Sequence, residues 1–212
     1  MKFLGECFDI HSSSRELIFP HHENENAIAA ALTGKSLAKY WIHCDRVLSA
    51  GKKLDEKAAG LTLADLMSMG YPGRVVRFWL LSSHYRKPIP FSKERLDNAK
   101  RALERLDRCI LKLCSVKQGQ PYAEREQLLY DLKTGFCSAM DDDLNISAAL
   151  ATIFSVVKKV NALILQNQLH PQDASQIVDG FRSIDAVLNI LNFFDDYSDP
   201  VLIFRVSMQV DV

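Results

Sequence analysis

The stretch "RKPIPFSKERLDNAKRALERL", residues 86–106, joins two kinds of sequence pattern. Pro88 and Pro90 disfavour a helix over the first residues of this stretch, because proline lacks the backbone N–H that a helix interior uses. After Ser92, apolar residues recur in steps of three and four, which is the spacing of one face of an amphipathic helix. We therefore predict that a mixed α/β region covers residues 1–90 and that an all-helical region follows it.

The helical region carries four segments with apolar residues at helical spacing, separated by breaks that include Gly119–Pro121 and His170–Pro171. The three clearest stripes run through Leu96, Leu103 and Ile110, through Ile146, Ile153 and Val160, and through Ile177, Phe181 and Ile184. This pattern predicts an antiparallel helical bundle over residues 91–197. Just before its third helix, Asp143 is expected to be the N-cap. Residues 198–212 are apolar and β-like, and we leave this tail unassigned.

The first 90 residues alternate between strand-like and helix-like stretches. "CFDIH" (7–11) and "KYWIHCDRVLS" (39–49) are rich in β-prone residues and predict two strands, with a loop at "SSS" (12–14) after the first. Between them, a helix is expected from Pro20 to Gly34. Thr62 and Pro72 are expected to start two further helices, the second running to about Tyr85. A strand, a helix and a strand in this order predict a parallel α/β unit with few strands.

Composition excludes several classes of protein. The 212 residues contain 26 basic and 26 acidic side chains, so no overall basic field attracts nucleic acid, and RNA binding would require a local patch. The five cysteines form no CxxC pair and indicate reduced thiols in a cytosolic protein. We find no signal peptide and no apolar run as long as a membrane span, so we expect a cytoplasmic protein without membrane contact.

The stretch "IFPHHENENA", residues 18–27, is a candidate metal site. His21 and Glu25 are four residues apart and share one helix face, where they could chelate a divalent ion, zinc first. A second interpretation is ordinary surface polarity, because acidic residues in a first turn are favoured by the helix dipole. Zinc requires at least three protein ligands, and nothing in the spacing requires Cys7 to be one. His43 fits a packed core residue better than a ligand.

Taken together, four segments resemble the bacterial-type, class I cysteinyl-tRNA synthetase family. "LGECFDIHSSSRELIFPHHENENA" (4–27) is similar to the family's Phe-Asp-Ile-His-Gly-Gly-Gly and Phe-Pro-His-His-Glu-Asn-Glu segment, and "YWIHCDRV" (40–47) to its next strand. "YPGRVVRFWLLSSHYRKPIPFSKERLDNAKRALERL" (71–106) looks like the segment that joins its catalytic and helical domains. "AMDDDLNISAALATIF" (139–154) resembles the acidic start of a later helix. The resemblance covers about residues 4–195.

The resemblance implies a fold and a reaction. The expected fold is α/β plus all-α: part of a Rossmann-like class I catalytic domain, without its N-terminal half, followed by a tRNA-stem-contacting bundle. The implied reaction is the ATP-dependent activation of cysteine and its transfer to tRNA, with zinc and magnesium as cofactors. The resemblance makes His21 and Glu25 two zinc ligands, while the family's two cysteine ligands and its His-Ile-Gly-His signature lie outside these residues. It assigns ATP contacts to Asp9, His11, Ser12 and Ser13.

Two departures from the family pattern fall on the loops that face the nucleotide. "KLDEK" (Lys53 to Lys57) is similar to the family's Lys-Met-Ser-Lys-Ser loop, and the resemblance makes Lys53 and Lys57 the candidate catalytic residues. The family's second lysine corresponds to Glu56 here, and a small shift in register would instead offer Lys57 or Lys52. A carboxylate at the usual lysine replaces an attraction for phosphate by a repulsion. Serines also replace a glycine triplet that allows close approach of the backbone to a nucleotide. We therefore expect this chain alone to be unable to form the adenylate.

A second function class stays open from the sequence. The chain could be a non-catalytic module that binds tRNA or a protein, with phosphate contacts from the first bundle helix at Lys93, Lys100, Arg101 and Arg105. Acidic residues alternate with these cations, so a solvated helix face explains them equally well. A third possibility is that an upstream half, or a second copy of the chain, completes the catalytic site.

Overall fold

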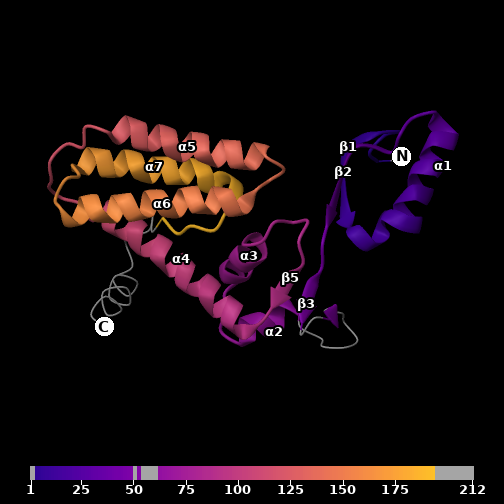
Figure 1. Ribbon diagram of the computed structural model, residues 1–212, viewed down its shortest axis with the longest axis horizontal. Coiled ribbons are helices and arrows are strands. Elements are labelled where there is room, and N and C mark those ends of the chain that lie inside the picture. The colour runs from indigo at the N-terminus through magenta and orange to yellow at the C-terminus, as the bar shows by residue number, and fades with distance from the viewer. Residues whose placement is uncertain (1–2, 50–51, 54–61, 194–212) are drawn as a thin grey trace. The chain divides into compact units, whose positions relative to one another are not determined.

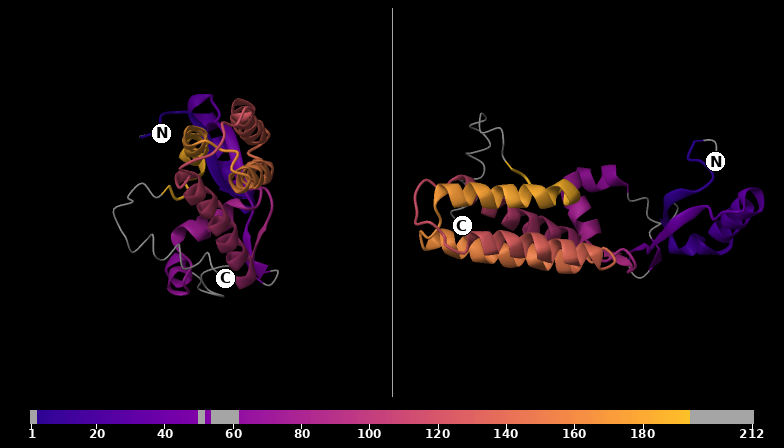
Figure 2. Two further views of the ribbon diagram at one scale, coloured as in Figure 1. Left: turned by 90° about the vertical axis from the view of Figure 1, so that its left-hand side faces the viewer. Right: turned by 90° about the horizontal axis from the view of Figure 1, so that it is seen from above.

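A computed structural model describes residues 3–49, 52–53 and 62–193 (Figures 1 and 2). The chain forms two compact units. The first contains Met1–Ala99 and Asp141–Ser147, and the second contains Lys100–Met140 and Ala148–Val212. The division falls inside the helix that follows the prolines, so the sequence-based boundary at residue 90 stays a prediction.

The first unit begins with the predicted strand, helix and strand. β1 (Phe8–Ser14) and β2 (Ala38–Cys44) pair in parallel, and α1 (Glu23–Thr33) connects them. A 3₁₀ turn (Arg15–Leu17) and a π turn (Ile18–His22) lead into α1. Gly34 ends α1 with a positive φ of 72°, a conformation that glycine adopts without steric cost.

Two details of the strands differ from the sequence-based expectation. Ser12–Ser14 are the last residues of β1 rather than a loop, because they pair in register with Ile42–Cys44, and this pairing outweighs their local preference for a turn. The single strand expected over 39–49 is two strands, β2 and β3 (Val47–Ser49). They separate where the backbone N–H of Asp45 donates to the carbonyl of Tyr85 (2.7 Å) instead of continuing the first ladder.

β3 belongs to a second small sheet of the described residues. It pairs antiparallel with β4 (Lys52–Lys53) and parallel with β5 (Ile89–Phe91). Two short helices follow β4, α2 (Leu63–Ser68) and α3 (Gly73–Leu81). Thr62 caps α2 as predicted, in a capping box with Asp65. α3 starts after Pro72 as predicted but ends at Leu81, four residues before Tyr85, and it buries Val75, Val76, Phe78 and Trp79.

The helical region contains the predicted four helices: α4 (Lys93–Cys114), α5 (Arg125–Asp141), α6 (Ile146–Leu165) and α7 (Pro171–Leu188). α5, α6 and α7 lie side by side in the second unit (Figures 1 and 2). The apolar stripes found in the sequence form its core, since buried side chains on the four helices include Leu103, Ile110, Leu132, Ile153, Val160, Ile177 and Phe181. His170 and Pro171 start α7 through a side-chain cap and a proline in the first turn.

Asp143 is not the N-cap of α6. It lies in the turn before that helix, with a positive φ of 53°, while Asn145 directly precedes the first helical residue, Ile146. Its carboxylate accepts hydrogen bonds from Tyr85 Oη (2.5 Å) and from Arg86 Nε (2.6 Å) and Nη2 (3.1 Å). These donors lie more than 50 residues earlier, so local sequence did not indicate them.

α6 is more apolar than the sequence reading suggested. By length and composition alone it could cross a membrane, with a mean hydropathy of 1.7 over 18 residues. Residues along its length, among them Ala149, Ile153, Val157 and Val160, are buried against the protein itself. A core helix of a water-soluble bundle meets the same criterion.

Candidate functional site

Histidines from three elements of the first unit gather beside the start of α1. His11 lies on β1, His22 immediately precedes α1, and His43 lies on β2. Parallel pairing places His11 directly opposite Trp41. The His11 ring stacks on Trp41 with centroids 4.5 Å apart, and the His22 ring lies 4.9 Å from His11 and 5.3 Å from Trp41.

Glu25 supplies the negative charge of this cluster. Its Oε1 lies 3.3 Å from Nε2 of His21, and its Oε2 lies 3.3 Å from Nε2 of His11. The carboxylate therefore faces one histidine with each oxygen. His22 Nδ1 and His43 Nε2 are 3.1 Å apart, which makes one of these rings a donor and the other an acceptor.

Three of these groups have ligand atoms positioned for a metal ion. In the described part of the chain, His11, His22 and Glu25 offer ligand atoms that all lie within 4.8 Å of one another. Nδ1 of His11, Nε2 of His22 and Oε2 of Glu25 are buried without a hydrogen bond. Buried polar atoms are normally satisfied, so these atoms point to a missing polar partner.

The environment of His22 favours a neutral imidazole. Burial lowers the pKa of His22, and the nearby His11 and His43 lower it further by charge repulsion, while Glu25 opposes the shift. A neutral imidazole has a free nitrogen lone pair, which is the form that binds metals. Charge and protonation are therefore compatible with a divalent ion at this cluster.

The sequence found part of this cluster. His21 and Glu25, predicted as a metal pair from their spacing, do face each other. His22 was not selected, His43 was assigned to the core, and His11 was assigned only to ATP. Cys7 lies outside the cluster, with its Sγ directed at the carbonyl of Phe8 (3.8 Å). The parallel pairing of β1 with β2 would have indicated His11 and His43, but register is not visible in the sequence.

The four residues expected to contact ATP all lie on β1. Asp9 is exposed and its Oδ1 forms an ion pair with Lys39 Nζ at 2.7 Å, while His11 belongs to the histidine cluster. Ser12 and Ser13 follow, the first exposed and the second half-buried. Lys53 lies in β4, and Glu56 and Lys57 lie outside the described residues.

The cations expected to contact tRNA all lie on α4. Lys93, Lys100, Arg101 and Arg105 are exposed. The Arg105 guanidinium lies over the ring of Phe154 on α6, 5.3 Å from its centroid. The Arg105 guanidinium therefore already has a contact within the protein, a cation–π interaction with Phe154.

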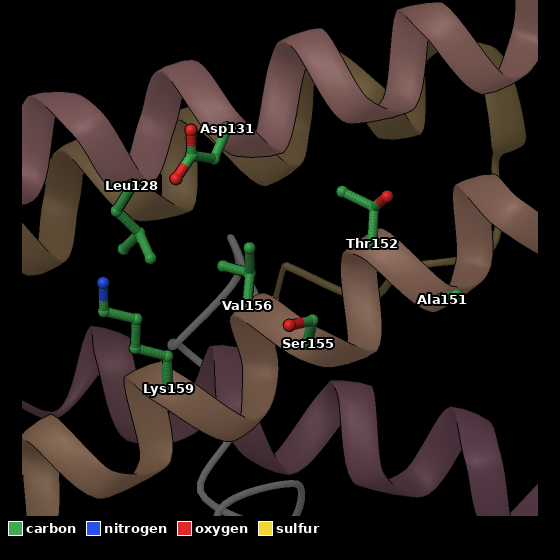
Figure 3. A pocket seen from close by; sticks show the side chains of 7 residues that line it. All are labelled: Leu128, Asp131, Ala151, Thr152, Ser155, Val156 and Lys159. Atoms are coloured by element: carbon green, nitrogen blue, oxygen red, sulfur yellow. The ribbon is translucent and has the colours of Figure 1, made fainter.

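A cavity in the second unit is another candidate site. It has a volume of about 370 Å³ and lies between α5 and α6, lined by Leu128, Asp131, Ala151, Thr152, Ser155, Val156 and Lys159 (Figure 3). It contains no histidine or cysteine, and Lys159 pairs with Glu124 at 3.4 Å. The histidine cluster is the stronger candidate for chemistry, because it combines metal-binding donor types with unsatisfied buried atoms.

Two family models match the chain. The model described as "tRNA synthetases class I (C) catalytic domain" matches residues 1–101, which include the histidine cluster. The model described as "DALR domain" matches residues 135–192, which include α6 and α7. The two matches have the same order as the α/β region and the helical region.

Curated relatives are cysteine–tRNA ligases. One from Carboxydothermus hydrogenoformans is 39% identical over 175 residues, covering 82% of this chain and 38% of the relative. One from Protochlamydia amoebophila is 34% identical over 91% of this chain and 41% of the relative. One from Thermodesulfovibrio yellowstonii is 33% identical over 99% of this chain and 45% of the relative. The chain thus spans about two fifths of the length of these relatives.

A solved structure shares the fold at low identity. It is the LeuRS chain of a ternary complex, LeuRS–tRNA–LeuAMS, from Agrobacterium radiobacter K84, with a TM-score of 0.65 and 16% identity over 86% of this chain and 26% of that one. This match supports a class I synthetase fold. The family models and the cysteine–tRNA ligase relatives show that the chain is a member of the cysteinyl-tRNA synthetase family.

Proposed function

We propose that this chain serves the reaction of cysteine–tRNA ligation, in which ATP activates cysteine and the aminoacyl group is then transferred to tRNA. The observation that carries the proposal is the convergence of His11, His21, His22 and Glu25 beside the start of α1. The relatives' names, cysteine–tRNA ligase, supply the reaction. The spacing of the ligand atoms supports a metal-binding role for the cluster within that reaction.

Zinc fits the donor set of this cluster. Imidazole nitrogen and carboxylate oxygen are both zinc ligands, and neighbouring ligands on one tetrahedral ion lie about 3–3.5 Å apart. The His21–Glu25 and His11–Glu25 separations, both 3.3 Å, agree with that spacing. In the proposed function His21 and Glu25 hold the ion, as the family resemblance implies, and His11 and His22 offer further nitrogen atoms on the other side of the Glu25 carboxylate. The bound ion would supply a Lewis acid that recognises the cysteine thiolate.

The protein's own side chains supply the remaining polar groups. The Glu25 carboxylate lies 3.3 Å from a ring nitrogen of His11 and of His21. Burial lowers the pKa of His22, which favours its neutral form beside His43. Trp41 forms an apolar platform under His11. In the proposed site, Asp9, Ser12 and Ser13 contact ATP with its magnesium ion, and Lys53 and Lys57 contribute positive charge from the signature loop. Glu56 in that loop opposes the phosphates, so we propose that this chain alone does not form the adenylate.

The metal-binding step is tested by titrating zinc into the chain in a calorimeter. Glu25→Gln removes the carboxylate charge that faces both histidines, and we expect zinc affinity to fall by about tenfold or more. Glu23→Gln changes an exposed acid on the same helix and is the matched control, with unchanged affinity expected. Equal zinc binding by wild type and Glu25→Gln would contradict the assignment.

The catalytic step is tested by cysteine-dependent exchange of pyrophosphate into ATP. We expect no exchange above background from the 212-residue chain by itself. Robust exchange would overturn the proposed inactivity, and its loss in Glu25→Gln would then assign the carboxylate to the reaction.

A second candidate is a non-catalytic tRNA-binding module, which the exposed cations of α4 favour. In this proposal the four helices form an antiparallel bundle that presents α4 to the tRNA stem. Replacing Lys100 and Arg101 by alanine would then weaken tRNA binding and reduce its salt dependence by about one phosphate contact for each cation. The absence of any gel shift at low salt would argue against this function.

A further inference from the structure

The second unit has a larger cavity at the end where α4 and α6 finish. It has a volume of about 660 Å³ and lies between the last turns of α4 and the segment that joins α6 to α7. Its apolar lining comes from Leu111, Val116 and Ile164, which are half-buried, and from the buried Leu169. A cavity of this size and character has room for several apolar side chains.

Two lysines place positive charge beside this apolar lining. Lys112 on α4 and Lys117 just after it both line the cavity and are both exposed. None of the described residues that line it is acidic. The occupant that fits is therefore an apolar segment with acidic residues next to it. The smaller cavity between α5 and α6 fits such a segment less well, because the Asp131 carboxylate lines it.

After α7 the chain reverses direction and runs back along that helix. The backbone N–H groups of Ile190 and Leu191 both donate to the carboxylate of Asp185, at 2.7 and 2.9 Å. A little further along the chain, the ring centroid of Phe193 lies 4.4 Å from the guanidinium of Arg182. Because Arg182 precedes Asp185 in α7, the chain is heading toward the start of α7 at its last described residue.

The start of α7 adjoins the cavity. Leu169 lines the cavity and is followed by the capping residue His170 and by Pro171. From Pro171 to Arg182 the helix rises about 17 Å, at about 1.5 Å per residue. An extended chain covers that distance in about five or six residues, at about 3.3 Å per residue. Residues 194–212, which lie outside the described residues, are therefore long enough to reach the cavity from Phe193.

The sequence of residues 194–212 has the composition that this cavity fits. Its apolar run is "VLIF", Val201–Phe204. Asp195, Asp196 and Asp199 precede that run, and Arg205 follows it as the one basic residue of the segment. An apolar run with several acidic residues beside it complements an apolar cavity with two lysines beside it.

We propose that this tail binds in the cavity of its own chain, with Val201–Phe204 against the apolar lining and the preceding aspartates beside Lys112 and Lys117. The bound tail would connect the end of α4 to the segment before α7 and would remove apolar surface from water. It gives a role to a segment that the sequence left unassigned. The inference goes beyond the proposed reaction, because it involves no cysteine, ATP or tRNA.

The test measures how fast trypsin cuts the full chain after Arg205. This bond adjoins the apolar run, so cleavage requires the tail to leave the cavity, and its rate reports the population of the open form. Mass spectrometry follows the loss of residues 206–212. A synthetic peptide of residues 194–212 gives the rate for the unbound segment, and we expect the full chain to be cut more slowly by about tenfold or more.

Charge reversal at the cavity tests where the tail binds. Lys112→Glu combined with Lys117→Glu replaces attraction by repulsion, so cleavage after Arg205 should become faster by about fivefold or more. The matched control combines Lys133→Glu with Lys158→Glu, which makes the same change of charge at exposed lysines on α5 and α6 that do not line the cavity. Its cleavage rate should equal that of the wild type.

Neutralising the tail should have opposite effects in the two backgrounds. Asp195→Asn with Asp199→Asn removes attraction in the wild type and should speed cleavage. In the chain that carries Lys112→Glu and Lys117→Glu, the same change removes repulsion and should slow cleavage. Circular dichroism checks that each variant keeps its helices.

Each result decides the proposal. Slow cleavage that depends on Lys112 and Lys117 and not on Lys133 and Lys158, in a chain that light scattering shows to be a monomer, supports it. Equal rates for the full chain and the peptide, equal effects of the two lysine pairs, or slow cleavage that neither pair changes would overturn it. A dimer that Lys112→Glu with Lys117→Glu dissociates would also overturn it, because the tail would then occupy a second copy. None of these outcomes bears on the proposed ligase function.

Discussion

Gly119 lies where two loops of the second unit approach each other closely. Its φ is +156°, and an added Cβ would meet the backbone carbonyl of Leu169 closer than 3.0 Å. The next residue, Gln120, donates its backbone N–H to the carbonyl of Asn167 at 3.1 Å. The loop after α4 and the loop after α6 therefore touch through their backbones at a position that excludes a side chain.

We expect Gly119→Ala to lower the free energy of unfolding by about 2–3 kcal/mol, because the methyl group clashes with backbone rather than with a movable side chain. Urea unfolding followed by helical circular dichroism measures this loss. Gly73→Ala is the control: Gly73 starts α3 with open space around it, and alanine there should be neutral or stabilise by up to about 1 kcal/mol. Equal effects of the two substitutions would contradict the close approach.

Glu25 has one contact that its neighbours in sequence predict and one that they do not. The pairing of His21 with Glu25 follows from helical spacing, and the structure places the two side chains 3.3 Å apart. The contact of Glu25 with His11 does not follow from spacing, since His11 lies on a strand 14 residues earlier. It required the fold to bring β1 beside α1.

At the scale of elements, the turn between α5 and α6 is tied to the segment before β5. Asp143 in this turn receives hydrogen bonds from Tyr85 and Arg86, and the Arg86 guanidinium lies 5.1 Å from the centroid of the Tyr85 ring. All these residues belong to the first unit, although Asp143 follows α5 in sequence. Asp143 therefore serves tertiary contacts rather than the start of α6.

This tie predicts a pH dependence. Hydrogen bonds from Arg86 and Tyr85 lower the pKa of Asp143 from 3.8 to about 2. A carboxyl whose pKa is lower in the folded state stabilises the fold at pH above 3.8 and loses that contribution as pH falls toward 2. We expect Asp143→Asn to have a lower Tm than wild type at pH 7 and the gap to close between pH 3.8 and 2.

Thermal unfolding of both proteins across that pH range measures the gap. Asp131→Asn on α5 is a control, because Asp131 accepts a hydrogen bond from Gln127 and faces no arginine or tyrosine among the described contacts. A Tm gap for Asp143→Asn that is constant over the whole range would contradict the charge-dependent tie.

At the scale of the whole molecule, α6 is apolar enough to cross a membrane, but residues along it are buried against the protein itself. Val160 on this helix is fully buried, whereas Leu165 at its end is 82% exposed. In a water-soluble bundle, Val160→Asp should cost about 3 kcal/mol or more, because it buries an unpaired charge, and Leu165→Asp should be close to neutral. Urea unfolding of the detergent-free chain measures both, and similar losses would contradict this arrangement.

Sequence alone determined the parts of this protein that depend on neighbours along the chain. Spacings within one or two helical turns account for the four helices of the helical region, the capping of α2 by Thr62, the end of α1 at Gly34 and the His21–Glu25 pair. Hydrogen bonds in a helix connect residues only four apart, so a short stretch of sequence contains the needed information.

Only the tertiary structure decided the features that depend on distant pairing. It extended β1 through Ser12–Ser14, divided residues 39–49 between two sheets, joined Asp143 to Arg86, and added His11, His22 and His43 to the His21–Glu25 pair. It also left Ile10 and Tyr40 exposed on one face of the sheet. Strand register and burial are set by residues far apart in the chain, and their energies are gained only when the fold brings them together.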